Sequence, residues 1–276
     1  MLHSIAENIK YIRSFLFDAL IRRFDCDYAI CVIIKNEADY IEEWIDYHFK
    51  IGFEKFYIYD NESTDNTREI LDKYIRKGIV DYIYCPGKGK QIPSYNDCIH
   101  RYRSKCRYIA FIDADEFIFP IEDENIYGIK KYLDKYAGLT INWMIFGSSH
   151  HIKKPEGSVL ENYTLRGKEA NKHVKTICNP RWVDYFNNPH FPRYVIKKYS
   201  VDENYKRVDG PFNEDLPAKS FRINHYYCKS QEEGIRKHQR GFADYADDRK
   251  KPWSNFIAHD LNEVFDDSIL KIDFHK

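Results

Sequence analysis

The segment Arg107-Tyr-Ile-Ala-Phe-Ile-Asp-Ala-Asp-Glu-Phe117 decides the fold, because an apolar run ends there in three acidic residues. Such a run is typical of a strand that is buried on both faces, as in a parallel sheet. Residues two apart on an extended turn project to the same side, so Asp113 and Asp115 can address one centre. Two carboxylates held that close repel each other unless a cation neutralises them, and oxygen ligands suit Mg²⁺ or Mn²⁺. The segment therefore predicts a divalent-cation site where this strand ends.

On either side of this segment the chain alternates between short apolar runs and helical periodicity. Runs typical of buried strands lie at 28–34, 55–59, 79–84 and 139–146, and helices are expected at 40–49, 65–78, 93–106 and 126–136. Strands that alternate with helices form right-handed βαβ units. We therefore expect an α/β fold with a Rossmann-like, mostly parallel central sheet and helices on both faces. Beyond Gly147 the pattern weakens into an irregular region, where a capping box at Ser230–Glu233 predicts one further helix.

Length and composition fit one large domain. The 276 residues carry 43 Lys and Arg against 43 Asp and Glu, so the excess of cations typical of nucleic-acid binding is missing. The 23 Tyr, 18 Phe and 4 Trp suit stacking on sugars or bases, although core packing uses the same residues. The seven Cys contain no CxxC pair, which favours reduced thiols and a cytoplasmic location.

Residues 9–24 predict an amphipathic helix near the N-terminus. One side of this helix would carry Ile12, Phe15, Leu16, Ala19 and Leu20. It is too short and too often interrupted by charges to be a membrane span, which needs roughly 18 apolar residues. Two alternatives stay open: the helix packs on its own domain, or it makes peripheral contact with the inner face of a membrane.

Polar residues also follow the other predicted strands, where ligands of an open parallel sheet bind. Asp60 follows the second strand and is a candidate acceptor for a uracil imide or a ribose hydroxyl, whereas Ser63 and Asp65 fit a turn and a helix cap. After the third strand, the Gly87–Lys90 loop offers backbone N–H groups and two cations to a phosphate. A surface hairpin explains that loop equally well.

Several motifs, in the same order along the chain, resemble one group of enzymes. Val32–Glu37, Tyr57–Asp65 and Phe111–Phe117 are similar to the nucleotide-sugar-binding half of GT-A glycosyltransferases. The finer resemblance, over about Tyr28 to Gly241, is to glycosyltransferase family 92 and the related family-2-like bacterial enzymes. It rests on Asn36-Glu37, Glu43-Trp44, Tyr47-His48, Gln91–Cys98, Asn142-Trp143, Phe146–Ser149, His173–Thr176, Pro180, Asn188–His190, Ile223–Tyr226, Lys229–Glu233, Lys237 and Arg240-Gly241.

This resemblance implies a GT-A fold and a metal-dependent, inverting enzyme of polysaccharide biosynthesis. Such an enzyme moves a hexose, often galactose, from a UDP-sugar to an acceptor glycan. The implied domains are an N-terminal helix (1–27), a catalytic domain (28–241) with a donor half (28–146) and an acceptor half (147–241), and a C-terminal extension (242–276). One departure concerns Gly147-Ser-Ser-His-His151, where the family tends to show Gly-Ser-Ser-Gly-His. The extra side chain at His150 leaves the shape of the acceptor side open.

The resemblance also implies roles for individual residues. Glu37 and Asp60 would lie near the uridine, Asp113 at the ribose and diphosphate, and Asp115 on the metal, with Asp113 as a second ligand. His225 is the candidate that completes the metal site, and a structural histidine is the alternative. Lys90 and Gln91 are further candidates for donor binding.

The general base that inversion requires is expected among loop acids. Glu161 is favoured over Glu156, and the pair Glu214 and Asp215 is the alternative. Trp143, Phe146 and Trp182 are candidates for stacking on sugar faces, although each could equally be a core residue.

Two other functions remain as alternatives at this point. A metal-dependent nucleotidyltransferase also needs carboxylates at strand ends, but it would normally carry a glycine-rich basic loop after the first strand, where this chain has Lys35-Asn36-Glu37. A non-catalytic glycan- or nucleotide-binding module is the second alternative, and the intact pair of Asp113 and Asp115 speaks weakly against it.

Overall fold

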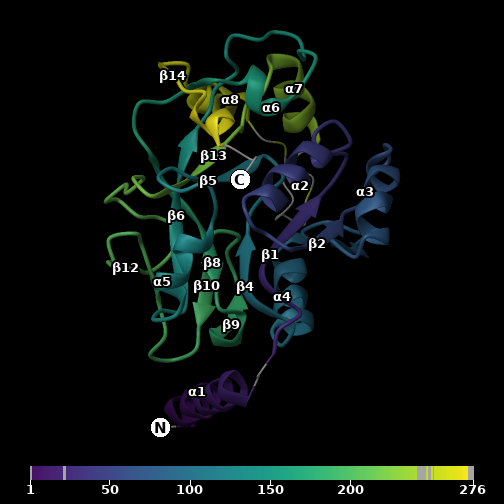
Figure 1. The fold of residues 1–276 in the computed structure, drawn as a ribbon. Coiled ribbons are helices and arrows are strands. Elements are labelled where there is room, and N and C mark those ends of the chain that lie inside the picture. The colour runs from purple at the N-terminus through teal and green to yellow at the C-terminus, as the bar shows by residue number, and fades with distance from the viewer. Residues whose placement is uncertain (1, 21–22, 241–246, 248–249, 251, 273–276) are drawn as a thin grey trace.

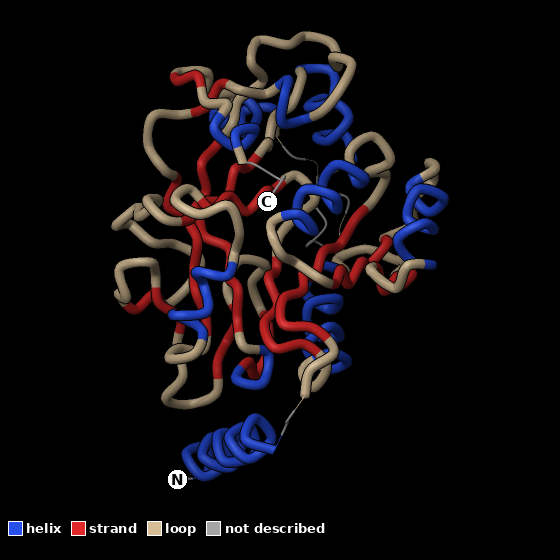
Figure 2. The backbone as a smooth tube through the Cα atoms, viewed as in Figure 1, coloured by secondary structure: helices blue, strands red, loops and turns tan. Residues whose placement is uncertain are grey.

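A computed structural model describes residues 2–20, 23–240, 247, 250 and 252–272. Its centre is a ten-stranded sheet in which eight strands follow the order β12-β11-β6-β8-β4-β1-β2-β3 (Figures 1 and 2). Of the other two strands, β13 pairs with β6 and β5 pairs with β13. The strands of this sheet are β1 (Cys26–Ile34), β2 (Lys55–Asp60), β3 (Val80–Tyr84), β4 (Cys106–Phe111), β5 (Glu116–Pro120), β6 (Gly138–Ile145), β8 (Asn171–Cys178), β11 (Ser200–Val201), β12 (Arg207–Val208) and β13 (Phe221–His225). Two small pairs lie outside it: β7 (Leu165–Arg166) with β14 (Val264–Phe265), and β9 (Val183–Phe186) with β10 (Pro192–Tyr194).

Helices cover both faces of the sheet. They are α1 (Leu2–Leu20), α2 (Ile41–Lys50), α3 (Thr67–Arg76), α4 (Gln91–Tyr102), α5 (Lys130–Leu133), α6 (Val159–Asn162), α7 (Gln231–Arg240) and α8 (Trp253–His259), with 3₁₀ turns η1 (Tyr127–Ile129), η2 (Pro180–Trp182) and η3 (Ser268–Lys271). The side chains of β1 alternate between the two cores. Ile30, Val32 and Ile34 join the core that includes α2 and α3, whereas Ala29, Cys31 and Ile33 join the core beneath α4.

The predicted α/β architecture is confirmed, with one refinement in strand direction. β4, β1, β2 and β3 run parallel, as expected from the alternating pattern. β8, however, lies antiparallel between β4 and β6, and it was not predicted as a strand. The polar residues of β8, which include Lys175, interrupt the apolar pattern from which a buried strand is recognised.

The irregular second half packs on the sheet and is held by a buried ionic group. The Asp266 carboxylate accepts hydrogen bonds from Arg166 Nε at 2.6 Å and Arg222 Nη2 at 2.8 Å. At Gly147 a Cβ atom would lie 2.6 Å from the backbone oxygen of Leu261, so this close approach of two segments requires glycine. Residues 252–272 are thereby fixed against the segment that begins at Gly147. The predicted boundary at residue 241 lies outside the described residues.

α1 lies apart from the other helices, beyond the end of the sheet at which β1 and β4 begin (Figure 1). It packs on η2, where Tyr11 and Phe15 face Trp182 with ring centroids 5.8 and 6.5 Å away. Among the described helices, α1 included, none is long and apolar enough to cross a membrane.

Candidate active site

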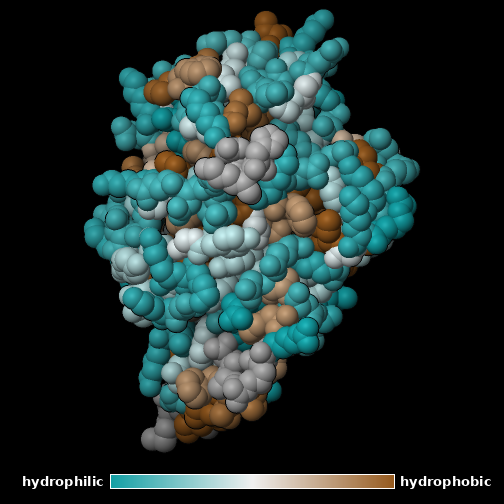
Figure 3. Space-filling model, in the orientation of Figure 1, coloured by the Kyte–Doolittle hydropathy of each residue, from teal (hydrophilic) through white to brown (hydrophobic). Residues whose placement is uncertain are grey.

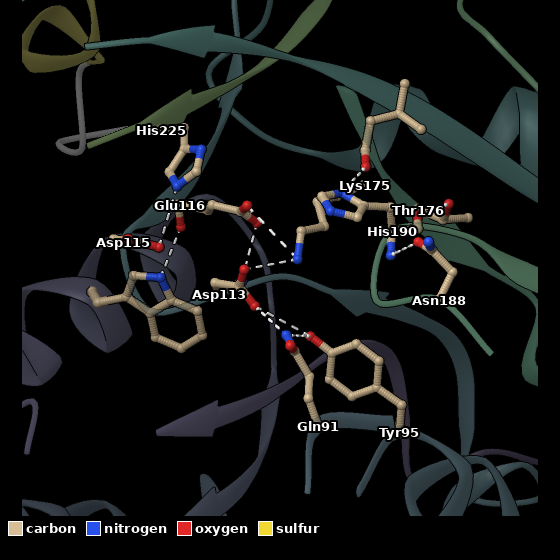
Figure 4. Close-up of polar contacts among 12 residues, drawn as sticks. Gln91, Tyr95, Asp113, Asp115, Glu116, Lys175, Thr176, Asn188, His190 and His225 are labelled. Atoms are coloured by element: carbon tan, nitrogen blue, oxygen red, sulfur yellow. Dashed lines mark hydrogen bonds and ion pairs between the residues drawn. The ribbon is translucent and has the colours of Figure 1, made fainter. Parts of the chain in front are cut away.

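Asp113 lies in the turn between β4 and β5, where its carboxylate accepts hydrogen bonds from Gln91, Lys175 and the Tyr95 hydroxyl (Figure 4). Its Oδ1 accepts a hydrogen bond from Gln91 Nε2 at 2.8 Å, and its Oδ2 accepts one from Lys175 Nζ at 2.9 Å. Burial would raise the pKa of Asp113, but the Lys175 ammonium outweighs it and holds the pKa below its usual value. Asp113 is therefore ionised at neutral pH, with 33% of its side chain still exposed.

Asp115, two residues later, has different partners. Its Oδ2 accepts a hydrogen bond from Lys237 Nζ at 2.6 Å, and its Oδ1 lies 3.5 Å from Nε2 of His225 at the end of β13. Burial opposes the charge of Asp115, but Lys237 and His225 hold its pKa well below the usual value. Lys237 belongs to α7 and also donates to the backbone oxygen of Tyr227 at 2.8 Å. The two aspartates thus face separate lysines.

Glu116 is the fully buried acid of this turn. Its Oε2 accepts a hydrogen bond from the backbone N–H of Asp113 at 3.0 Å, while Oε1 lies 3.7 Å from Lys175 Nζ. Burial raises the pKa of Glu116 well above its usual value. Trp44 of α2 fixes the backbone here, because its indole N–H donates to the Glu116 carbonyl oxygen at 2.8 Å. The turn is therefore held rigidly from both faces of the sheet.

The residues around Asp115 could hold a divalent cation whose remaining ligands come from a bound substrate. Asp115 Oδ1 and His225 Nε2 face each other and offer two ligand atoms to a metal ion. Mg²⁺ or Mn²⁺ commonly fills its remaining coordination positions with water and substrate phosphates. In the described part of the chain, no group of three or more His, Cys, Asp and Glu side chains could hold a metal by itself. The carboxylate of Asp113, the predicted second ligand, is engaged by Gln91 and Lys175.

A cleft of about 480 Å³ opens beside Asp115. The loops after β1 and β2 form one wall and the segment from β13 into α7 forms the other, as expected for a ligand site at the carboxyl ends of strands. Acidic and basic side chains both line it: Glu37, Asp39, Asp65, Asp115 and Glu233, with Lys35, Lys229, Arg236 and Lys237. The cleft therefore offers cations to a phosphate group next to the proposed metal ligands.

The residues predicted for donor binding are distributed unevenly around this cleft. Glu37 lines it directly, and its backbone N–H donates to Thr67 Oγ1 at 3.0 Å. Gln91, the first residue of α4, lies behind it and holds Asp113. Lys90 immediately precedes α4 and is not part of the cleft lining.

Asp60 corrects the sequence interpretation, which left its carboxylate free to bind a nucleoside. The side chain is buried at the end of β2, where Oδ1 accepts the Ser63 N–H at 2.9 Å and Oδ2 accepts the Tyr82 hydroxyl at 2.7 Å. Both oxygens are thus engaged in shaping the turn after β2. Burial and the hydrogen bond to Asp60 raise the pKa of Tyr82 to about 12.

The predicted general bases are also placed away from the cleft. Glu161 is exposed and forms a capping box at the start of α6, where Ser158 Oγ accepts its backbone N–H at 3.1 Å and donates to its Oε2 at 3.1 Å. Glu156 is exposed in the loop before α6. Glu214 pairs with Lys172 and Asp215 with Lys206, both at the surface. None of these four acids lines the cleft beside Asp115.

The three candidate stacking residues have three different surroundings. Trp143 stacks on His173 with centroids 4.9 Å apart and touches His225 at 4.2 Å, so it adjoins the site. Phe146 is fully buried in the core against Tyr226, and Trp182 is covered by α1. Of the three, Trp143 alone is placed to influence a ligand near Asp115.

Comparison with known proteins decides the family. A model described as glycosyltransferase family 92 matches residues 27–273. The chain belongs to glycosyltransferase family 92. That match leaves α1 wholly outside the family region.

The curated relatives that the chain matches are plant proteins, so the expected bacterial origin of the resemblance is not confirmed. Glycosyltransferase family 92 protein Os08g0121900 of Oryza sativa subsp. japonica is 32% identical over 72% of this chain and 32% of its own length. The Arabidopsis thaliana protein called galactan beta-1,4-galactosyltransferase GALS2 is 29% identical over 46% of this chain and 27% of its own. The chain thus spans about a third of the length of the curated relatives it matches.

Among solved structures, S. aureus TarS (residues 1–349) in complex with UDP is similar in fold. It has 15% sequence identity and a TM-score of 0.40, over 64% of this chain and 60% of that one. This likeness is too weak to assign a ligand.

The departure from the family 92 motif at His150 now has a structural explanation. His150 adopts a φ angle of 64°, in the left-handed region that glycine enters at little cost. Its side chain is exposed, so the backbone keeps the turn that the family's glycine favours without filling the site. The preceding Ser148 and Ser149 are fixed by hydrogen bonds from their N–H groups to Asp260 and Asn262.

Two residues of the site were missed as such in the sequence. Lys175 and Lys237 are the cations that hold Asp113 and Asp115, yet each is a single lysine far from its partner along the chain. Both lie within the segments that resemble family 92, His173–Thr176 and Lys229–Lys237. Their place in these motifs is the signal that the sequence offers, but it does not indicate which aspartate each lysine meets.

Proposed function

We propose that this chain carries a metal-dependent, inverting hexosyltransferase that uses a UDP-sugar donor and a glycan acceptor. The proposal rests on one observation above all. In a member of family 92, an ionised Asp115 lies beside His225 at the edge of a cleft whose lining contains four cations and five acids. The cations can match the charge of a diphosphate on several sides, and a divalent cation between the diphosphate and Asp115 would offset the charge of the acids.

The metal would be held by Asp115 and His225. When bound, a divalent cation offsets the negative charge that develops on a departing diphosphate. Lys237 and Arg236, both on the α7 wall, would add positive charge to the same region from the protein itself. His225 is suited to ligation because burial lowers the pKa of its imidazole, which keeps the ring neutral.

Asp113 would act from behind the cleft. Lys175 and Gln91 fix its carboxylate in the ionised form, and its partly exposed surface is available to a ribose hydroxyl. Glu37, which lines the cleft after β1, would contact the nucleoside. Removing either side chain should therefore weaken nucleotide binding independently of the metal.

Galactose is the sugar we propose to be transferred. The support is the name of the Arabidopsis relative, a galactan beta-1,4-galactosyltransferase that matches under half of this chain. Hydrolysis of UDP-galactose should then exceed hydrolysis of UDP-glucose when Mn²⁺ is present and no acceptor is added. Equal rates for both donors would leave the transferase proposal intact and remove galactose from it.

Ligand-induced stabilisation tests the donor and the metal together. UDP with Mn²⁺ should raise the melting temperature more than GDP or ADP does, because a ligand that binds the folded state stabilises it. Asp115→Asn and His225→Ala should abolish the Mn²⁺-dependent part of that shift. Asp209→Asn, which alters an exposed acid paired with Arg207, is the matched control and should keep the whole shift. Equal shifts for all three nucleotides would refute the UDP site.

A further inference from the structure

Unlike an ordinary surface helix, α1 turns its aliphatic face to solvent and its more polar face to the domain. Its outward face carries five aliphatic side chains spaced at i, i+4, i+7, i+11 and i+15, which share one helical face. Each is at least half exposed: Ile5 50%, Ile9 51%, Ile12 54%, Leu16 53% and Leu20 72%. The stripe that they form, here called the α1 stripe, is about 22 Å long at 1.5 Å per residue.

The inward face of α1, in contrast, meets the domain through polar and aromatic groups. Lys10 Nζ bonds to Asp184 at 2.7 Å, Ser14 is buried, and Tyr11 faces Trp182. An amphipathic helix normally turns its apolar stripe to the core. In α1 the apolar face instead points to solvent, where it has no partner within the described chain. Brown side chains accordingly gather over α1 at the lower end of the molecule in Figure 3.

Exposed cations lie on α1 and in the segments next to it. Arg13 lies on the helix and Arg23 follows it. Lys197 lies over the Tyr11 ring at 5.6 Å, and Lys105 is bonded through its carbonyl oxygen to the N–H of Asp25. All four cations are exposed; of the acids in the segment after α1, Asp25 is exposed as well, and Asp27 pairs with Arg107. The neighbouring acids Glu7 and Asp184 are paired with Lys10.

We propose that the α1 stripe docks on an anionic lipid bilayer surface. Aliphatic side chains on one face and cations at its border are what an interfacial helix requires: the apolar face enters the acyl boundary and the cations meet the headgroups. A second copy of this chain is the less suitable occupant, because a symmetric contact would bring the same cations together. A bilayer instead neutralises them.

Docking through α1 would orient the enzyme. The helix lies at the end of the sheet where β1 and β4 begin, and the cleft beside Asp115 lies where they end (Figure 1). The cleft would therefore open away from the lipid surface. If the proposed function holds, the accessible acceptor is a glycan that extends from the surface rather than a sugar at the headgroups.

Vesicle sedimentation tests the proposal with the full chain. The protein should sediment with vesicles of phosphatidylcholine and phosphatidylglycerol, and more weakly with phosphatidylcholine alone. The triple variant Ile9→Ser/Ile12→Ser/Leu16→Ser should lose more than tenfold in partitioning, because three apolar side chains no longer leave water. Ile257→Ser on α8, an aliphatic residue with 66% exposure, is the matched control and should sediment like the parent chain.

A second variant tests the contribution of the cations to vesicle binding. Arg13→Gln/Arg23→Gln should weaken sedimentation with anionic vesicles by about fivefold for each cation removed, and added salt should have the same effect. Failure of the parent chain to sediment with anionic vesicles would overturn the proposal. So would a dimer in solution that the triple variant converts to a monomer. The UDP-induced rise in melting temperature is measured separately, so failure of docking and failure of the transferase proposal are distinguishable.

Discussion

Replacing Lys175 by Met should destabilise the protein strongly, because the lysine is the buried counterion of the turn after β4. Its side chain is 1% exposed, and its Nζ lies 2.9 Å from Asp113 and 3.7 Å from Glu116. Breaking a buried ion pair by removing one partner typically costs about 3–5 kcal/mol. Because Asp113 keeps 33% of its side chain exposed and Glu116 can take up a proton, we expect the lower end, about 3 kcal/mol.

Urea unfolding followed by tryptophan fluorescence would measure this loss, with Lys130→Met as the control. Lys130 forms an exposed pair with Asp134, a kind of pair that contributes about 0–1 kcal/mol. In the double variant Lys175→Met/Asp113→Asn, the uncompensated charge is removed, so part of the lost stability should return. In this double-mutant cycle, the loss of unfolding free energy in the double variant is compared with the sum of the losses in Lys175→Met and Asp113→Asn. The difference isolates the Lys175–Asp113 interaction.

The pH dependence supplies a second check on Lys175→Met. The folded pKa of Asp113 is lowered, so its ion pair stabilises the protein above the unfolded value of about 3.9 and is lost as pH falls through the folded pKa. The stability gap between the parent chain and Lys175→Met should therefore narrow in acid. A loss below about 1 kcal/mol at neutral pH, or a gap that stays the same in acid, would refute this reasoning.

Three further substitutions test other parts of the site. Lys237→Met should strengthen binding of Mn²⁺ alone by several-fold in calorimetry, because the lysine that occupies Asp115 Oδ2 is gone, while UDP binding weakens; unchanged Mn²⁺ affinity would show that Lys237 does not compete. Glu161→Gln should leave donor hydrolysis and transfer unchanged, because its carboxylate accepts the Ser158 hydroxyl at the start of α6 and does not line the cleft; a large loss of turnover would restore it as the base. His150→Val should lower the unfolding free energy by about 1–2 kcal/mol, whereas His150→Gly should not lower it; equal stability of the two variants in thermal unfolding would contradict the left-handed turn.

Local sequence patterns predicted much of the fold between residues 26 and 111. The strands that became β1, β2 and β4 are mostly apolar runs, and they were recognised because burial on both faces leaves no room for alternation. The capping box at Ser230 was equally readable: Ser230 Oγ accepts the N–H of Glu233 at 3.3 Å, and the Glu233 carboxylate accepts the N–H of Ser230 at 3.1 Å. Such features depend on residues a few positions apart.

Only the tertiary structure decided which lysine pairs with which aspartate in the site. Lys175 reaches Asp113 across 62 residues and Lys237 reaches Asp115 across 122, and both pairings depend on how β8 and α7 dock against the turn after β4. The direction in which α1 turns its aliphatic stripe was decided in the same way. Periodicity gives a helix its apolar face, but only the packing of that helix on η2 leaves the face exposed to water. Sequence spacing determines local geometry, whereas long-range ion pairs and helix orientation follow from contacts between distant segments.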